Sequence, residues 1–104
     1  MIVVVLVTCP STAVARRLAR QVVARRLAAC VNLVPGVESV FWWQGKVDQA
    51  KEALLVIKTP ARRFARLKRA IQALHPYEVP EILALAVHAR KLPHHLTLVD
   101  TQSR

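Results

Sequence analysis

Residues 2–7 of this chain read Ile-Val-Val-Val-Leu-Val, and this short run decides the fold. Its density of β-branched residues favours a strand over a helix. Pro10 then stops the strand, and Ser11 or Thr12 offers a helix N-cap. A strand with one solvent-exposed face alternates apolar with polar residues, and this run does not alternate. It therefore predicts a strand that is buried on both faces.

Predicted helices and further strands follow this first strand along the chain. One helix is expected from about residue 12 to residue 26, and a second helix, opened by Thr59 and Pro60, over residues 62–74. The second strand is predicted over residues 29–34 and continues extended over residues 37–43, and the last two strands are predicted over residues 53–57 and 82–87. Pro35 and Gly36 mark a bend, and residues 45–51 are interpreted as the turn of an antiparallel hairpin.

The resulting β-α-β-β-α-β order predicts an α+β, ferredoxin-like fold. Right-handed crossovers place both helices on one face of a single sheet, which leaves the other face bare. Residues 53–57 and 82–87, like residues 2–7, are apolar on both sides. The bare face would then exceed the apolar area that soluble monomers usually expose. We therefore expect one domain, spanning residues 1–104, that associates symmetrically with copies of itself.

The composition indicates a protein with a packed hydrophobic core, and the distribution of apolar residues bears on its cellular location. Of the 104 residues 54% are hydrophobic, which excludes a disordered chain and exceeds what a small globule can hide alone. The longest apolar run is far shorter than the roughly 20 residues that cross a bilayer, and no charged region precedes it as in a secretory signal. We expect a cytoplasmic protein. Cys9 and Cys30 lack metal-knuckle or redox-pair spacing, so free thiols are expected.

The formal charge of +10 attracts nucleic acid or anionic lipid in general, but it does not choose between them. Arginines occupy one side of each predicted helix, and we interpret them as a solvated outer face. RNA recognition motifs share the β-α-β-β-α-β order, which makes an RNA- or DNA-binding module an alternative. Such modules stack bases on aromatic residues of their central strands, and residues 53–57 contain no aromatic residue. Nucleic-acid binding is therefore not the preferred interpretation.

Four segments carry a resemblance to a known family. They are Arg26-Leu27-Ala28-Ala29-Cys30-Val31-Asn32; Pro35-Gly36 leading to Ser39 and Trp43-Gln44-Gly45-Lys46-Val47; Glu52 followed by Leu55 and Lys58-Thr59; and Leu74-His75-Pro76-Tyr77-Glu78-Val79-Pro80-Glu81-Ile82. In order and spacing they resemble the CutA family of divalent-cation tolerance proteins. The resemblance implies a ferredoxin-like homotrimer, similar to PII signalling proteins, with an extended β-hairpin and a short C-terminal helix. The segment around residues 86–98 departs from the family pattern.

The family also implies a response to copper and other divalent metal ions. His75 and Glu81 are the candidate metal ligands for copper or zinc, because imidazole suits both metals and a carboxylate can complete the shell with water or another subunit's donor. The alternative is that His75 caps the second helix and Glu81 pairs with Lys58 or an arginine. Some relatives carry a cysteine ligand where Val7 stands here, and Cys9 is at best a displaced substitute.

Three family-matched positions, Trp43, Lys58 and Tyr77, are expected around a cleft between subunits. A PII-like sensor of a small anionic ligand, held there by Lys58, is a further alternative function. Cys30 is interpreted as a small structural core residue. We expect no enzyme and no organic cofactor, because the sequence contains no phosphate-cradling glycine loop and no nucleophile elbow.

Overall fold

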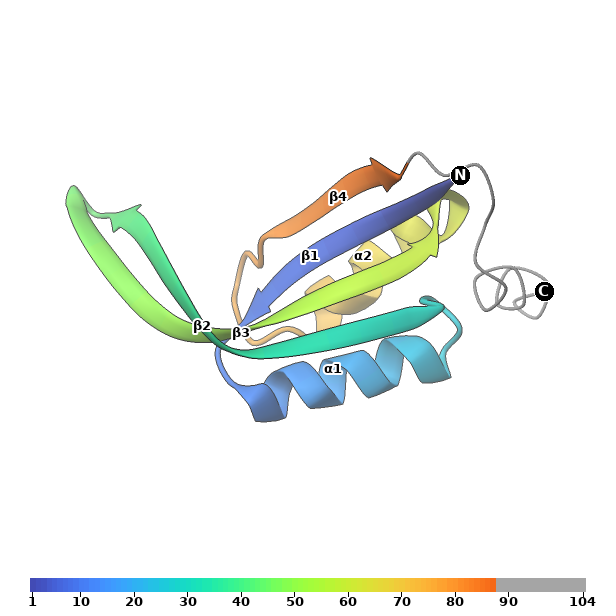
Figure 1. Ribbon diagram of the computed structural model, residues 1–104, viewed down its shortest axis with the longest axis horizontal. Coiled ribbons are helices and arrows are strands. Elements are labelled where there is room, and N and C mark those ends of the chain that lie inside the picture. Colours follow the sequence, from blue (N-terminus) through green and yellow to red (C-terminus); the bar gives the residue numbers. More distant parts are fainter. Residues whose placement is uncertain (88–104) are drawn as a thin grey trace.

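The computed structural model describes residues 1–87, which form a four-stranded sheet with two α-helices (Figure 1). The elements are β1 (Ile2–Cys9), α1 (Thr12–Ala24), β2 (Cys30–Trp43), β3 (Lys46–Pro60), the 3₁₀ turn η1 (Ala61–Arg63), α2 (Phe64–Leu74) and β4 (Ile82–Val87). This confirms the predicted order. The expected C-terminal helix and most of the atypical tail lie outside the described residues.

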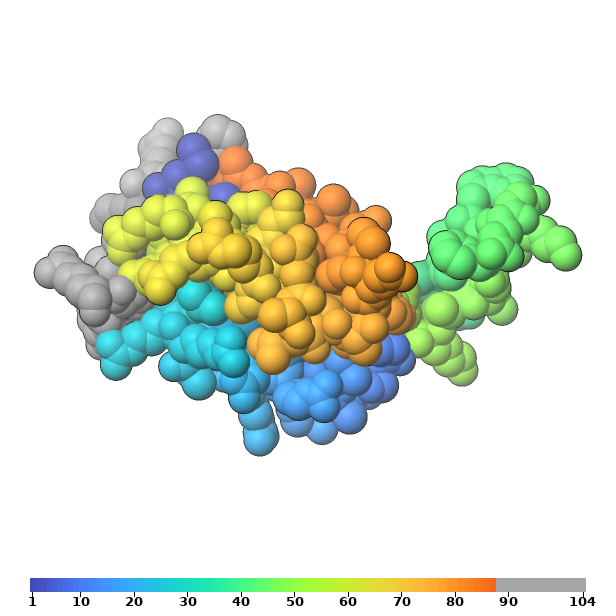
Figure 2. All heavy atoms as spheres, turned by 180° about the vertical axis from the view of Figure 1, so that it is seen from behind, coloured from blue at the N-terminus to red at the C-terminus, as the bar shows by residue number. Residues whose placement is uncertain are grey.

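The sheet has the strand order β2-β3-β1-β4, and every neighbouring pair is antiparallel. Both helices lie on one face of it, as Figures 1 and 2 show from opposite sides. The ferredoxin-like fold is thereby confirmed. None of the helices within residues 1–87 is long and apolar enough to cross a membrane.

The core lies between the helices and the sheet. Alternate residues of β1 and β3 point towards the helices and are buried, with Val5 and Leu55 fully so. Leu18 and Val22 of α1 and Leu67 and Ile71 of α2 pack against them, at helical spacings of four. Both helices thus pack their apolar faces against the same side of the sheet.

The first helix is capped as expected but ends two residues early. The Ser11 hydroxyl accepts a hydrogen bond of 3.2 Å from the Val14 N–H, which serves one of the free donors at the helix start. At the other end Arg26 adopts a left-handed backbone with φ of 59°, and the Leu27 N–H donates to the Val22 carbonyl at 2.9 Å. This reversal resembles a Schellman ending and turns Leu27 into the core.

The predicted turn over residues 45–51 and strand start at Ala53 are wrong. The hairpin turns at Gln44 and Gly45, whose φ angles of 50° and 77° suit a tight two-residue turn, and β3 already begins at Lys46. Residues 46–51 are polar-rich and exposed apart from the partly covered Ala50, because this part of the hairpin projects beyond the body of the sheet (Figure 1). Apolar patterning cannot reveal a strand that has no core to pack against.

The junction between β3 and the second helix also differs from the prediction. Thr59 does not open the helix but lies fully buried in β3, where its hydroxyl donates to the Leu27 carbonyl at 2.7 Å. The chain then passes through η1, and α2 starts only at Phe64. A buried hydroxyl needs such a partner, and here the partner comes from the α1–β2 connection.

Within residues 1–87 no helix lies on the other face of the sheet, and we call it the open sheet face. It consists of the residues that alternate with the buried ones in the strand registers: Val4, Leu6, Cys30, Asn32, Val34, Leu54, Val56, Lys58, Leu83 and Leu85. Leu83 and Leu85 are 51% and 54% exposed. The prediction that these strands are apolar on both sides is therefore confirmed.

Candidate functional site

Residues 75–81, which connect α2 to β4, hold three of the predicted site residues. The connection begins at His75, whose backbone is extended and whose N–H donates to the Ile71 carbonyl at 2.8 Å. Pro76 cannot continue a helix, so the chain turns away here. His75 is therefore the C-cap residue of α2, and its ring is turned towards the end of β1.

The His75 ring is held by a hydrogen bond at each nitrogen. Nε2 lies 2.8 Å from the Thr8 carbonyl, and Nδ1 accepts a 3.1 Å hydrogen bond from the Tyr77 N–H. This pairing fits the tautomer with its hydrogen on Nε2. The ring is only 6% exposed. A metal ion could bind His75 in this arrangement only by displacing one of these two partners.

Tyr77 links the same connection to the root of the hairpin. Its ring centre lies 4.7 Å from that of His75, and its hydroxyl donates to Glu52 Oε2 at 2.9 Å. Partial burial, followed by the hydrogen bond to Glu52 and that carboxylate's negative charge, raises the pKa of Tyr77 to about 12. His75, Tyr77 and Glu52 together tie residues 75–77 to β1 and β3.

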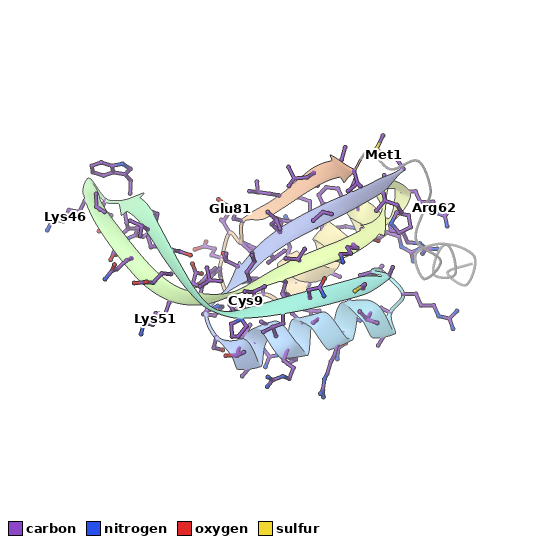
Figure 3. The ribbon with its side chains drawn as sticks, in the orientation of Figure 1. Met1, Cys9, Lys46, Lys51, Arg62 and Glu81 are labelled. Carbon is purple, nitrogen blue, oxygen red and sulfur yellow. The ribbon has the colours of Figure 1, made fainter. Side chains whose placement is uncertain are left out.

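Cys9 lies beside this cluster at the end of β1 (Figure 3). Its side chain is fully buried. Burial, with a smaller effect from the charge of Glu52, raises the pKa of the thiol to about 11. A thiol that keeps its proton at neutral pH is a poor nucleophile.

Glu81 directly precedes β4 (Figure 3). Its side chain is exposed, so the carboxylate is open to solvent. Within residues 1–87, no three His, Cys, Asp or Glu side chains converge in a way that could hold a metal ion. One protomer thus does not supply a protein-built metal site in the described part of the chain, and the metal hypothesis for His75 and Glu81 stays a prediction.

The three residues predicted for a cleft lie apart within the protomer. Trp43 is at the hairpin tip, opposite Lys46, and is 60% exposed. Lys58 is half-buried at the other end of β3, where it pairs in register with Val4 and Cys30 on the open sheet face. Between them lie about 40 Å of extended strand. Only a neighbouring subunit could bring these positions together.

Cys30, which the sequence analysis assigned to the core, begins β2 on the open sheet face and is partly exposed. Glu52, Cys9 and Thr8 were not predicted as neighbours of the His75–Tyr77 pair. Glu52 is a carboxylate that directly precedes the apolar run 53–57, which was an available signal. Thr8 contributes only its backbone carbonyl, for which a sequence offers no signal.

The amino-acid sequence is similar to a described protein family and to several of its members. A family model described as CutA1 divalent ion tolerance protein matches residues 3–100. The divalent-cation tolerance protein CutA of Thermus thermophilus is 54% identical over 84 residues, which are 81% of this chain and 82% of its own length. The human protein CutA is 44% identical over 88 residues, which are 85% of this chain but 49% of its own length. The chain thus spans about half of that longer relative.

Solved structures agree with the sequence comparison. The crystal structure of CutA1 from Oryza sativa superimposes with a TM-score of 0.91 at 42% identity, and the match covers 99% of this chain and 94% of that one. At 42% identity the two chains share many amino acids at equivalent positions as well as the fold.

The Tyr77–Glu52 contact predicts a pH-dependent change in stability. Because the pKa of Tyr77 is about 12 in the folded chain and 10.0 is its ordinary value, the folded state keeps the proton longer than the unfolded state. This contribution to stability is complete below pH 10 and is lost as the pH rises towards 12. Tyr77 is the sole tyrosine, so ultraviolet absorbance reports its titration directly.

We expect Glu52→Gln to lower the pKa of Tyr77 towards 10, because the substitution removes the negative charge and weakens the hydrogen bond. Glu38→Gln is the matched control, since Glu38 lies on the exposed hairpin and should leave the titration unchanged. A native protein that titrates near pH 10 would contradict the assignment.

Proposed function

The chain belongs to the CutA1 divalent ion tolerance protein family, and from this membership we propose that it acts as a non-catalytic homotrimer that contributes to tolerance of divalent cations. The observation that carries the proposal is the open sheet face, whose apolar side chains are not covered by either helix of residues 1–87. The raised pKa of the Cys9 thiol supports a role without nucleophilic catalysis.

Burial of the open sheet face against other protomers would supply the missing cover. Each large aliphatic side chain gains roughly 1.5–3 kcal/mol when it is fully removed from water. Several such side chains lie together on β1, β3 and β4. Closed rotational symmetry is the usual way to bury one surface on every copy, and the family resemblance supplies the number three.

The hairpin tip gives a second reason for association. Val40, Phe41, Trp42 and Trp43 are all exposed there, and Trp42 is 74% accessible. The tip projects away from the body of the protomer, so its own core cannot cover these side chains (Figure 1). We propose that the tip packs on a neighbouring subunit, which is also how Trp43 would approach the cleft predicted around Lys58 and Tyr77.

We also propose a cytoplasmic location. Cys9 and Cys30 are free thiols on separate strands, which suits a reducing compartment.

The trimer proposal predicts a mass three times the 11.6 kDa of the protomer at micromolar concentration. Leu85→Glu should reduce that mass, because it places a charge on the open sheet face. Val23→Glu is the matched control, since Val23 is a similarly exposed apolar residue on α1 and faces away from the sheet. Size-exclusion chromatography with light scattering measures both. A monomeric wild-type protein would overturn the proposal.

Direct metal binding, by copper or zinc, is the more specific part of the proposal. Glu81 supports it, because its carboxylate is exposed and it lies beside the β4 edge of the open sheet face. His75 fits less well, since both ring nitrogens already have partners. We therefore propose that Glu81, with donors from a neighbouring subunit, holds the ion, and that His75 joins it only if it exchanges a hydrogen bond for the metal.

Calorimetric titration of metal-stripped protein with Cu²⁺ and Zn²⁺ tests this assignment. Saturable binding should be at least tenfold weaker in Glu81→Gln and unchanged in Glu38→Gln, provided that both variants keep the oligomeric state of the parent. His75→Ala should mainly lower the melting temperature, since it removes two hydrogen bonds of a buried ring. Absent binding, or binding that Glu81→Gln leaves unchanged, would exclude this site.

Lys58 favours a second candidate function, the sensing of a small anion between subunits. Its side chain is half-buried on the open sheet face, and within residues 1–87 no carboxylate pairs with its ammonium group. Closure of a trimer over that face would bury the charge, and a buried ammonium group requires an opposite charge. A small anionic ligand in the cleft would satisfy this requirement.

A thermal-shift screen with ATP, ADP and inorganic phosphate tests the second candidate. A bound anion should raise the melting temperature of the parent protein but not that of Lys58→Met, which keeps the apolar stem. Lys51→Met, on the exposed hairpin, is the control and should still respond. A flat screen for the parent protein would reject these anions as ligands.

A further inference from the structure

The two helical segments of the sequence together carry a formal charge equal to the net charge of the chain. Residues 12–26 and 61–74, which we call the helix layer, contain ten of the sixteen basic residues and none of the six acidic ones. The remaining six basic and six acidic residues cancel, so the helix layer alone accounts for the formal charge of +10. The basic residues of the layer are Arg16, Arg17, Arg20, Arg25, Arg26, Arg62, Arg63, Arg66, Lys68 and Arg69.

These side chains belong to two neighbouring helices on the same face of the sheet. The two helices lie side by side on the far side of the sheet from the open sheet face (Figure 2). Arg26, Arg62 and Arg63 make other interactions, so the inference rests on the seven other basic residues. All seven are exposed. If the open sheet face is buried by self-association, the helix layer stays on the outside of the assembly.

Charge repulsion within the layer has a structural cost. Arg16 and Arg20 are four residues apart on α1, and Arg66 and Arg69 are three apart on α2. Like charges at these spacings destabilise a helix by about 0.2–0.5 kcal/mol per pair. Neither helix has an acidic residue in its first turn to compensate. A layer that only had to be soluble would gain stability from mixed charges, so the uniform sign favours an interaction with an anionic partner.

We propose that the helix layer binds the phosphate backbone of a nucleic-acid duplex without sequence preference. Nine of the ten basic residues are arginine, whose planar guanidinium group donates two parallel hydrogen bonds to a phosphate. Contacts of this kind position a protein on a duplex but do not identify bases. A uniformly positive layer with no acidic side chain complements that evenly charged polymer.

The composition of the layer disfavours two other anionic partners. Membrane-surface helices bury Trp, Phe or Leu among their basic residues. Single strands stack their bases on aromatic side chains. The one aromatic residue of the helix layer, Phe64, packs against the core, and the exposed tryptophans lie on the hairpin. The inference also differs from the RNA-recognition alternative, because it uses the helices and not the open sheet face.

Fluorescence anisotropy with short labelled DNA and RNA duplexes tests the proposal in the full chain. The test variant is Arg16→Gln with Arg66→Gln, which removes one charge from each helix. The control is Lys46→Gln with Lys51→Gln, which removes the same charge from the exposed hairpin. Both must retain the melting temperature and oligomeric state of the parent.

We expect parent binding that weakens steeply between about 50 and 200 mM salt. The test variant should reduce the slope of log affinity against log salt by about 0.9 for each phosphate that it no longer neutralises, and the control should retain the parent slope. Equal effects in both variants would overturn the proposal in favour of net charge alone. Absent duplex binding, including the case in which phosphatidylserine vesicles bind instead, would overturn it as well.

Discussion

The structure depends on a sheet that has apolar side chains on both faces, while both helices of the described residues lie on one face. β1 lies at the centre, pairs with β3 on one side and β4 on the other, and sends Val5 into the helix-side core and Leu6 to the open sheet face. A strand of this composition is stable only if both of its faces leave water. The described helices cover one face, and the proposed association would cover the other. The proposed oligomerisation would then follow from the same residues that form the fold.

The sequence predicted the parts of the fold in which local pattern and tertiary environment agree. β1, β4 and both helices were recognised because apolar periodicity reflects burial, and burial determines their side-chain pattern. The root of β3 was found for the same reason, through residues 53–57. The distal half of the hairpin was not found, because residues 46–51 have no core beneath them and therefore no apolar pattern. Thr59 was misplaced because its helix-capping chemistry also suits a buried hydroxyl with a distant carbonyl partner.

The candidate site was predicted less well, because its contacts join residues far apart in the sequence. His75 and Tyr77 are two positions apart and could be grouped from the sequence, but their partners Thr8 and Glu52 come from β1 and β3. Together they fasten the connection between α2 and β4, which positions the last strand at the sheet edge. In this protomer the family motif around His75 therefore has a structural use, whatever ligand the assembled protein takes.

The sheet topology also constrains the order in which the protein can form during its synthesis. β1 leaves the ribosome first, yet its neighbours are β3 and β4, and the Ile2–Val87 pair spans nearly the whole described chain. The central strand β1 therefore cannot form its hydrogen bonds to neighbouring strands until β3 and β4 have left the ribosome. Long-range pairing of this kind slows folding and leaves apolar edges open to wrong partners. Both edges of β1 therefore stay unpaired in the nascent chain until β3 and β4 have been synthesised.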